Sequence, residues 1–206
     1  MERTAMRKWL KSYKTEINPT QEQIQKINKT IGDDGNLEIK TLISQEKIEK
    51  RVAELAEQMN KDYAGKELYL ICILKGSIFF TCQLAKQLTM PVQLDFMSVS
   101  SYGNDTVSSK KITIKKDLEE DIAGKEVLII EDIIDTGLTM NCLKKLLSER
   151  KPASLKVCTL LDKSSRRLVT LDVEYTGFEI PDQFVVGYGM DYAQKYRNLP
   201  YIGIIE

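Results

Sequence analysis

The stretch that decides the fold is Val127-Leu-Ile-Ile-Glu-Asp-Ile-Ile-Asp-Thr-Gly-Leu-Thr-Met140. Its unbroken aliphatic start is typical of a strand buried on both faces in a parallel sheet. The apolar spacing from Met140 onward predicts a helix. The acids and the Thr-Gly-x-Thr turn between these two elements therefore lie at the carboxyl end of a strand, where open α/β sheets bind ligands.

The turn itself has the groups that a phosphate needs. Thr136, Gly137 and Thr139 offer hydroxyls and unpaired backbone N-H groups at the start of a helix, and Glu131 and Asp132 suit a metal ion or sugar hydroxyls. Each motif alone is weak, because acids and threonines also cap ordinary solvated loops. In this order after an aliphatic strand, they resemble the phosphoribosyl diphosphate signature of the type I phosphoribosyltransferases.

The composition favours one α/β domain with no polyanionic partner. At 206 residues, 42% hydrophobic and 29% charged, the chain is long enough for one buried core and short for two. Its 30 basic and 30 acidic residues balance, which disfavours nucleic acid as a partner. The absence of histidine excludes histidine-dependent catalysis, so carboxylates must supply any metal site, and they favour Mg²⁺.

The cysteines and the amino terminus indicate a cytoplasmic protein. Cys72, Cys82, Cys142 and Cys158 show no paired spacing and are expected to be reduced core thiols. The sequence shows neither a secretory signal nor an apolar run of membrane-spanning length.

Residues 1–36 are predicted to form a helical extension, and residues 37–206 the main domain. Two short amphipathic helices are expected in the extension, packed on the core or across a dimer. The alternative is a hairpin that docks on a partner or a membrane surface.

Other segments bring polar groups to the same sheet edge. Ser44 is expected to cap a helix, and the aliphatic strand from Leu68 to Leu74 ends in Lys75-Gly76-Ser77, a second anion site or an ordinary turn. The polar tract 100–109 is interpreted as a lid that carries Tyr102, although such a tract can also be disordered. A strand over 155–161 is expected to place Lys163 at this edge. Two more short strands are expected over 173–178 and 184–189, and the segment 190–200 follows them, for which a salt-bridged surface helix is the alternative.

Together these segments, from about Leu37 to Glu206, resemble the hypoxanthine-guanine branch of the type I phosphoribosyltransferases. The resemblance implies an α/β fold with a twisted, mainly parallel sheet flanked by helices, and a small hood built from both ends of the domain. It also implies transfer of the phosphoribosyl group of phosphoribosyl diphosphate to N9 of hypoxanthine or guanine, giving IMP or GMP and pyrophosphate, in a homodimer or homotetramer. A xanthine-preferring enzyme and an RNA-binding regulator on the same fold remain as alternatives.

The resemblance also implies roles for individual residues. Asp135 would lie beside N7 of the purine, Lys163 would face its 6-oxo group, Phe184 would stack on it, and Val185 would offer backbone contacts. Glu131, Asp132 and Asp191 would serve magnesium, Asp132 also the ribose, and Lys75, Gly76 and Arg197 the pyrophosphate. Thr136, Gly137, Leu138 and Thr139 would hold the 5′-phosphate, with Leu138 where some relatives have lysine, and Ser101 and Tyr102 would belong to the lid. A cis peptide bond is implied between Leu74 and Lys75.

A regulatory ligand follows from the two anion sites. Because both flank one ribose, a guanine nucleotide with phosphates at its 5′ and 3′ positions, such as guanosine tetraphosphate, is expected to compete with phosphoribosyl diphosphate.

Overall fold

The computed structural model describes residues 38–102 and 111–205, apart from the side chains of Ser101, Tyr102 and Lys111. The predictions for residues 1–36 and for the tip of the lid lie outside the described residues. Residues 41–204 form one compact unit, which contains both helical layers and the six-stranded sheet. Residues 1–40 with 205–206 form a second unit, of which only 38–40 and 205 are described.

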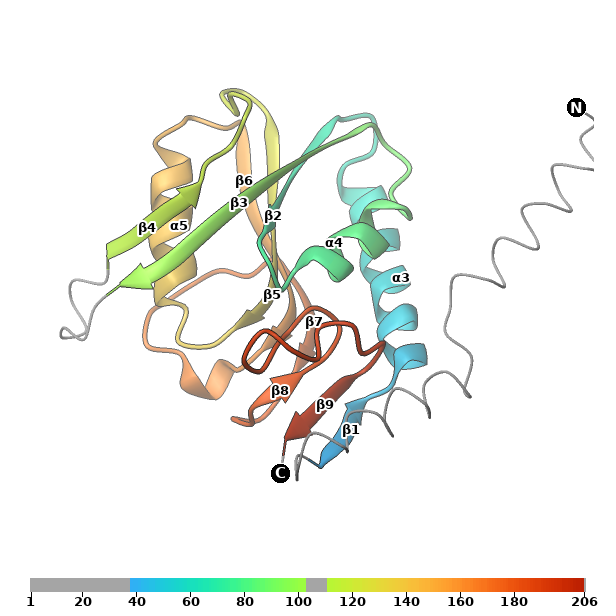
Figure 1. Cartoon of the computed structure of the whole chain (residues 1–206). Coiled ribbons are helices and arrows are strands. Elements are labelled where there is room, and N and C mark those ends of the chain that lie inside the picture. Colours follow the sequence, from blue (N-terminus) through green and yellow to red (C-terminus); the bar gives the residue numbers. More distant parts are fainter. Residues whose placement is uncertain (1–37, 103–110, 206) are drawn as a thin grey trace, which may run out of the picture. The chain divides into compact units, whose positions relative to one another are not determined.

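The central sheet has six strands in the order β4-β3-β2-β5-β6-β7 (Figure 1). The strands are β2 (Leu68–Ile73), β3 (Val92–Tyr102), β4 (Lys111–Lys116), β5 (Glu126–Ile134), β6 (Ser154–Asp162) and β7 (Tyr175–Glu179). All neighbours pair in parallel except β3 and β4, which are antiparallel. Every residue of β2 is buried, as expected for a strand covered on both faces.

The strand order reverses between β2 and β5. From β2 the chain moves outward to β3 and β4, and it then returns to β5 on the other side of β2 and continues to β6 and β7. Ligands of open α/β sheets bind at the carboxyl ends of the strands at such a reversal. Cys72 of β2 lies in register with Ile130 of β5, so the segments after these two residues leave the sheet next to each other.

Two helices cover one face of the sheet and a third covers the other (Figure 1). Helix α3 (Gln45–Asp62) begins after Ser44, whose hydroxyl accepts the backbone N-H of Lys47 at 3.4 Å. Its buried residues lie at helical spacing: Ile48, Val52, Leu55, Ala56 and Met59. Helix α4 (Ile78–Ala85) lies on the same face, whereas α5 (Leu138–Ser148) packs on the opposite face through Met140, Leu143 and Leu147.

A second sheet has three strands in the order β1-β9-β8. Its strands are β1 (Ile39–Ile43), β8 (Val185–Val186) and β9 (Ile202–Ile205), so it unites the two ends of the domain as the expected hood does. The strand predicted over 184–189 is therefore only two residues long. The segment 190–200 consists of turns and isolated bridges, and the surface helix considered for it is not formed.

Two further expectations need correction. Strand β3 continues through Ser100 to Tyr102 and pairs with β4, so the lid interpretation of the polar tract applies at most to residues 103–110. The thiols are only partly core groups: Cys72 and Cys158 are buried, Cys82 is exposed, Cys142 is half-buried, and none of the four forms a disulfide within the described residues. Within the described part of the chain, no helix is long and apolar enough to cross a membrane.

Candidate active site

Three segments of the chain meet at the end of β2. The peptide bond between Leu74 and Lys75 is cis, as the resemblance implies. A Cβ atom added to Gly76 would overlap Oδ2 of Asp132, and one added to Gly189 would overlap the carbonyl oxygen of Gly76. The turn after β2 is therefore held between the acidic end of β5 and the C-terminal segment, and both glycines are required by close approach.

The C-terminal segment brings a cation, an acid and an amide to this turn, which carries a cation of its own. Nη2 of Arg197 lies 2.6 Å from Oδ1 of Asp191, and Nη1 donates to the carbonyl of Gly189 at 2.7 Å. Nζ of Lys75 donates to Oε1 of Gln194 at 3.1 Å. Lys75, Asp191 and Arg197 are thus brought together, although they lie far apart in the sequence.

This arrangement depends on an unusual backbone path. Within the segment 187–196, positive φ angles occur at Gly187, Tyr188, Gly189, Ala193, Gln194 and Tyr196. Left-handed residues interrupt any helix, because each of them turns the chain away from the helical path. The resulting loop returns on itself, with Gly189 N-H donating to the carbonyl of Arg197 at 2.9 Å.

Glu131 and Asp132 form the acidic end of β5, and both are half-buried. Oε1 of Glu131 accepts the N-H of Asp132 at 3.2 Å, and Oδ1 of Asp132 accepts the N-H of Ile133 at 2.9 Å. Removal from water and the neighbouring Asp132 carboxylate raise the pKa of Glu131 well above its usual value. A cation at this position would favour the ionised form of Glu131.

The donor set fits a metal that shares its ligands with a substrate. Among the described residues, no group of three or more acidic, cysteine or histidine side chains could hold an ion alone. Mg²⁺ commonly binds through one or two carboxylates together with substrate phosphates and water. Asp132 lies against Gly76, and Asp191 pairs with Arg197, which donates to the carbonyl of Gly189 beside Gly76, so each could provide such a carboxylate.

The Thr-Gly-x-Thr turn opens α5 as predicted, with Gly137 at a φ of 78° and the helix beginning at Leu138. The Leu138 side chain is buried, so only its backbone faces the turn, and its N-H lies 3.5 Å from Oγ1 of Thr136. A Cβ at Gly137 would meet Cδ of Arg167 at 2.9 Å. The turn is thus a helix N-terminus with hydroxyls beside it, which can bind an anion.

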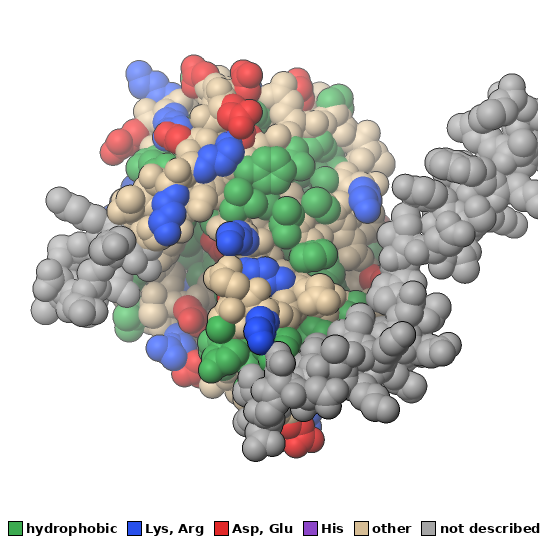
Figure 2. All heavy atoms as spheres, viewed as in Figure 1, with side chains coloured by type: hydrophobic (Ala, Val, Ile, Leu, Met, Phe, Trp, Pro, Cys, Tyr) green, Lys and Arg blue, Asp and Glu red, His purple; other side chains and the backbone are tan. Residues whose placement is uncertain are grey.

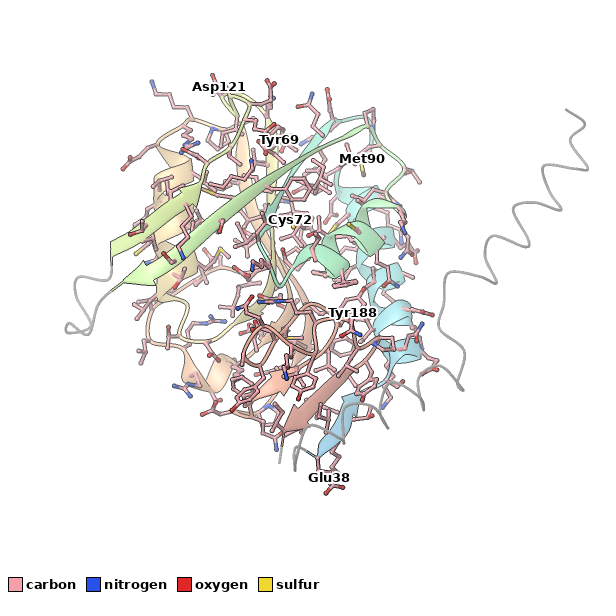
Figure 3. All side chains as sticks on the ribbon, in the orientation of Figure 1. Glu38, Tyr69, Cys72, Met90, Asp121 and Tyr188 are labelled. Carbon is pink, nitrogen blue, oxygen red and sulfur yellow. The ribbon has the colours of Figure 1, made fainter. Side chains whose placement is uncertain are left out.

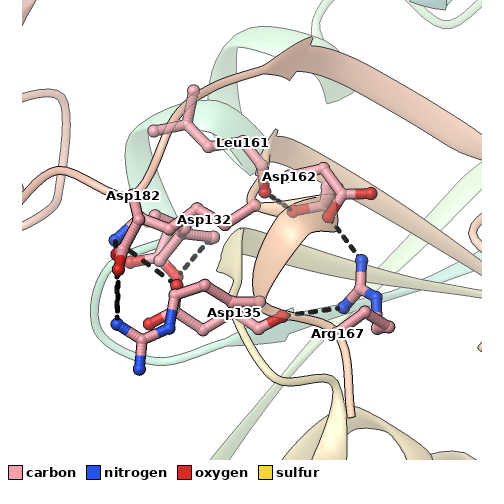
Figure 4. Close-up of polar contacts among 10 residues, drawn as sticks. Asp132, Asp135, Leu161, Asp162, Arg167 and Asp182 are labelled. Atoms are coloured by element: carbon pink, nitrogen blue, oxygen red, sulfur yellow. Dashed lines mark hydrogen bonds and ion pairs between the residues drawn. The ribbon is translucent and has the colours of Figure 1, made fainter. Parts of the chain in front are cut away.

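Lys163 follows the end of β6 and lies between two acids, Asp135 and Asp182. Figure 4 labels both acids. Lys163 is buried, and its Nζ lies 3.3 Å from Oδ1 of Asp135 and 3.5 Å from Oδ1 of Asp182. Arg166 donates to both carboxylate oxygens of Asp182, at 3.1 and 2.9 Å, and this contact holds the pKa of Asp182 below its usual value. Arg167 donates to the carbonyl of Asp135 at 3.2 Å and pairs with Asp162.

An aromatic side chain is available near these charges. Phe184 is 55% exposed, and its ring meets the edge of Tyr192 with the centroids 5.9 Å apart. Such an exposed ring, supported from one side, can stack on a planar ligand. Val185 is buried in β8 and can offer only its backbone.

The structure thus gathers two groups of predicted residues: one around Gly76, with Lys75, Asp132, Asp191 and Arg197, and one of Asp135 and Lys163. The side chains of Ser101 and Tyr102 lie outside the described residues. The contacts of four further residues could not be predicted from the sequence: Gln194, Arg166, Arg167 and Tyr192. Asp182 had a usable signal, since it sits in a Pro-Asp turn just before Phe184.

A mainly parallel sheet with an acidic strand end and a Thr-Gly-x-Thr turn where its strand order reverses is the arrangement of the class of phosphoribosyltransferases. The family model described as phosphoribosyl transferase domain matches residues 38–193, and the chain belongs to this family. Within it, the chain belongs with the hypoxanthine phosphoribosyltransferases, as the following relatives show. A second model, described as a helix-turn-helix domain, matches residues 6–32, which lie outside the described residues.

Curated relatives and solved structures agree on this placement. The chain is 50% identical over 168 residues to a hypoxanthine phosphoribosyltransferase of Haemophilus influenzae, covering 80% of this chain and 94% of the relative. It is 50% identical over 167 residues to a hypoxanthine-guanine phosphoribosyltransferase of Streptococcus pneumoniae, covering 81% and 93%. A crystal structure of a hypoxanthine-guanine phosphoribosyltransferase from Bacillus anthracis superimposes with a TM-score of 0.80 at 50% identity, covering 82% of this chain and 100% of the other.

Proposed function

We propose that this chain is a purine-salvage glycosyltransferase that moves the phosphoribosyl group of phosphoribosyl diphosphate to N9 of hypoxanthine or guanine. The observation that carries the substrate assignment is the pair of Asp135 and Lys163, 3.3 Å apart at the sheet edge that bears the phosphate turn. A 6-oxopurine presents an acceptor at O6 beside N7, so a lysine and a carboxylate this close together match O6 and a protonated N7. Adenine has an amino group at that place, to which an ammonium group cannot donate.

The reaction breaks the bond between C1′ and the diphosphate oxygen and forms a bond between C1′ and N9. Positive charge develops on the ribose and negative charge on the departing pyrophosphate. Lys75 and Arg197 are positioned to stabilise that anion, and Asp135 accepts the proton that leaves the imidazole ring of the purine. Magnesium, held by Asp132 and Asp191 together with the diphosphate, would supply further positive charge.

The remaining assignments complete the proposal. The turn from Thr136 to Thr139 holds the 5′-phosphate through its hydroxyls and backbone N-H groups, Phe184 stacks on the base, and Val185 contacts it through the backbone. Glu131 completes the acidic end beside Asp132. Ser101 and Tyr102, at the end of β3, help to exclude water from the activated sugar. Four cysteines that form no disulfide among the described residues suit the reducing cytoplasm, where we place the enzyme.

The alternatives kept from the sequence gain no support from the relatives, which are named hypoxanthine or hypoxanthine-guanine phosphoribosyltransferases. The test is an initial-rate assay with phosphoribosyl diphosphate, magnesium and each purine in turn. Formation of IMP and GMP that stops when a chelator removes magnesium is the expected result. Product from adenine alone, or no nucleotide from any purine, would reject the assignment.

We also propose that the chain forms homodimers or homotetramers. Apolar side chains gather over α4 and β3 (Figure 2), and Ile78, Phe79 and Leu94 are among the exposed large hydrophobic residues. Exposed apolar patches of this kind are typical of protein interfaces. Light scattering of the wild type and of Phe79→Glu tests the surface: the variant should form smaller particles, and an unchanged mass would reject this face as the interface.

Guanosine tetraphosphate is proposed as a competitive inhibitor. The pair that suits a 6-oxopurine, the phosphate turn and the Lys75-Gly76 turn lie at one sheet edge, so a guanine nucleotide with phosphates at both ends of its ribose could use all three. Calorimetry should then show tighter binding than for GMP. Equal affinity, or inhibition that saturating phosphoribosyl diphosphate does not relieve, would contradict the proposal.

A further inference from the structure

One neutral side chain connects the charged groups at the pyrophosphate end of the site. Oε1 of Gln194 accepts from Nζ of Lys75 at 3.1 Å and lies 3.4 Å from Nη2 of Arg197. The backbone N-H of Gln194 donates to Oδ2 of Asp191 at 2.8 Å, and its Nε2 lies 3.4 Å from the same oxygen. The carboxamide therefore contacts both cations with its oxygen and the acid with its nitrogen.

We infer that Gln194 is a positioning residue that holds Lys75 and Arg197 ready for the diphosphate without neutralising them. This inference rests on the proposed function, because it assumes that these two cations receive pyrophosphate. A lysine side chain loses much rotational freedom when it is fixed. A contact that fixes it before the substrate arrives lowers the cost of binding.

An amide suits this position better than a carboxylate. Arg197 already pairs with Asp191 at 2.6 Å, so part of its charge is compensated within the protein. A carboxylate at 194 would pair with both cations, compete with the diphosphate for them, and repel the nearby Asp191. An amide, unlike a carboxylate, accepts from the cations with its oxygen and donates to the acid with its nitrogen at the same time.

Neither packing nor backbone preference accounts for a glutamine here. Gln194 is exposed, so its side chain fills no core space. Its φ angle is 67°, a region that glycine and asparagine adopt more easily than glutamine does. A glutamine side chain is long enough for its carboxamide to contact Lys75, which follows the carboxyl end of β2.

The experiment compares Gln194→Ala with the isosteric Gln194→Glu, and uses Gln58→Ala on the exposed face of α3 as the matched control. In Gln194→Ala we expect the KM for phosphoribosyl diphosphate and the calorimetric Kd for pyrophosphate to rise about fivefold to tenfold, as for loss of one ordinary hydrogen bond at an exposed position. The KM for hypoxanthine should change by less than about twofold, because the base-binding groups are untouched. Gln194→Glu should weaken pyrophosphate binding more than Ala does, and Gln58→Ala should match the wild type.

The order of the variants separates positioning from a structural role. If side-chain length alone mattered, Glu would be milder than Ala, and that order would overturn the inference. Unchanged pyrophosphate binding in Gln194→Ala would overturn it as well. Gln194→Asn tolerates the left-handed backbone but is too short to reach Lys75, so it should behave like Ala; wild-type binding in Asn would contradict the inference even if Ala unfolds. A wild type that makes no nucleotide would instead reject the proposed function, so the two failures are distinguishable.

Discussion

Replacement of Gly76 by alanine should abolish most activity while the fold survives. An added Cβ would overlap Oδ2 of Asp132 and lie 2.5 Å from its Cγ, whereas ordinary Cβ contacts begin at 3.4 Å. The carboxylate must therefore shift by about 1 Å, a misplacement that can lower rates about a hundredfold. We expect kcat/KM for phosphoribosyl diphosphate to fall by roughly that factor.

The cost in stability should be small, because the obstructing atoms belong to the end of a side chain that can swing away. The shift would break the hydrogen bond from Ile133 N-H to Oδ1 of Asp132, now 2.9 Å long, which contributes about 1 kcal/mol. For a domain of this size, that free energy corresponds to a decrease in Tm of about 2 to 4 °C. Initial rates of IMP formation and thermal unfolding followed by circular dichroism measure the two effects.

Two other glycines provide the controls. Gly65 has a φ of 75° and nothing within 4 Å of an added Cβ, so Gly65→Ala should cost about 1 to 2 kcal/mol of backbone strain and keep full activity. Gly189→Ala would strike the main-chain oxygen of Gly76, which cannot swing away, so it should lose both activity and stability. The reasoning is refuted if Gly76→Ala keeps kcat/KM within about threefold of the wild type, or if Gly65→Ala loses as much activity.

Four further substitutions or deletions test other parts of the account. Asp135→Asn should lower turnover roughly a hundredfold or more with the fold intact, because an amide cannot take the proton from the purine; a magnesium-saturated rate near that of the wild type would contradict this role. Lys163→Gln should raise the KM for hypoxanthine and guanine about tenfold or more, and that for phosphoribosyl diphosphate much less, whereas equal changes would count against base recognition. Asp95→Asn should destabilise the domain by about 1 to 3 kcal/mol at pH 7, because buried Asp95 accepts from the hydroxyl of Tyr69 and the N-H groups of Phe96 and Glu119, each at 2.7 Å. Burial alone would raise the pKa of Asp95, but these hydrogen bonds outweigh burial, so its pKa in the folded protein is lowered. The difference in unfolding free energy between the wild type and Asp95→Asn should therefore be complete above about pH 5 and shrink as the pH falls below about 4. A difference that does not depend on pH would contradict an ionised Asp95. Deletion of the residues before Leu37 should change stability or assembly and leave the chemistry intact; a folded, identically assembled truncate without activity would overturn that view.

Local signals in the sequence were sufficient for the central sheet. The aliphatic runs of β2 and β5 predict buried strands because no polar side chain interrupts them, and both are buried in the structure. Ser44 predicts the start of α3 because its hydroxyl can satisfy a free N-H group of the first turn. In Figure 3, Tyr69 lies near the start of β2 and Cys72 lies near its end. That end leads into the turn that carries Lys75.

Contacts across the site could not be read in the same way. Gln194 and Lys75 are joined by a hydrogen bond over 119 residues of sequence, and neither residue type signals the other. A salt-bridged surface helix was the alternative for the C-terminal segment, which carries Asp191 and Arg197 six residues apart. In the structure, left-handed residues at 193, 194 and 196 fold the segment back, and the ion pair forms through a loop. The end of β3 was missed because a polar edge strand carries little apolar alternation.

The most direct test of the central claim is a competition in one reaction. Equal concentrations of hypoxanthine and adenine are supplied with phosphoribosyl diphosphate and magnesium, and nucleotides and pyrophosphate are measured by chromatography. The pairing of Lys163 with O6 and of Asp135 with N7 predicts IMP and pyrophosphate in equal amounts, with at most about one part in a hundred of AMP, since a mispaired buried donor costs several kcal/mol. Comparable amounts of AMP and IMP, or pyrophosphate released without any nucleotide, would contradict the account.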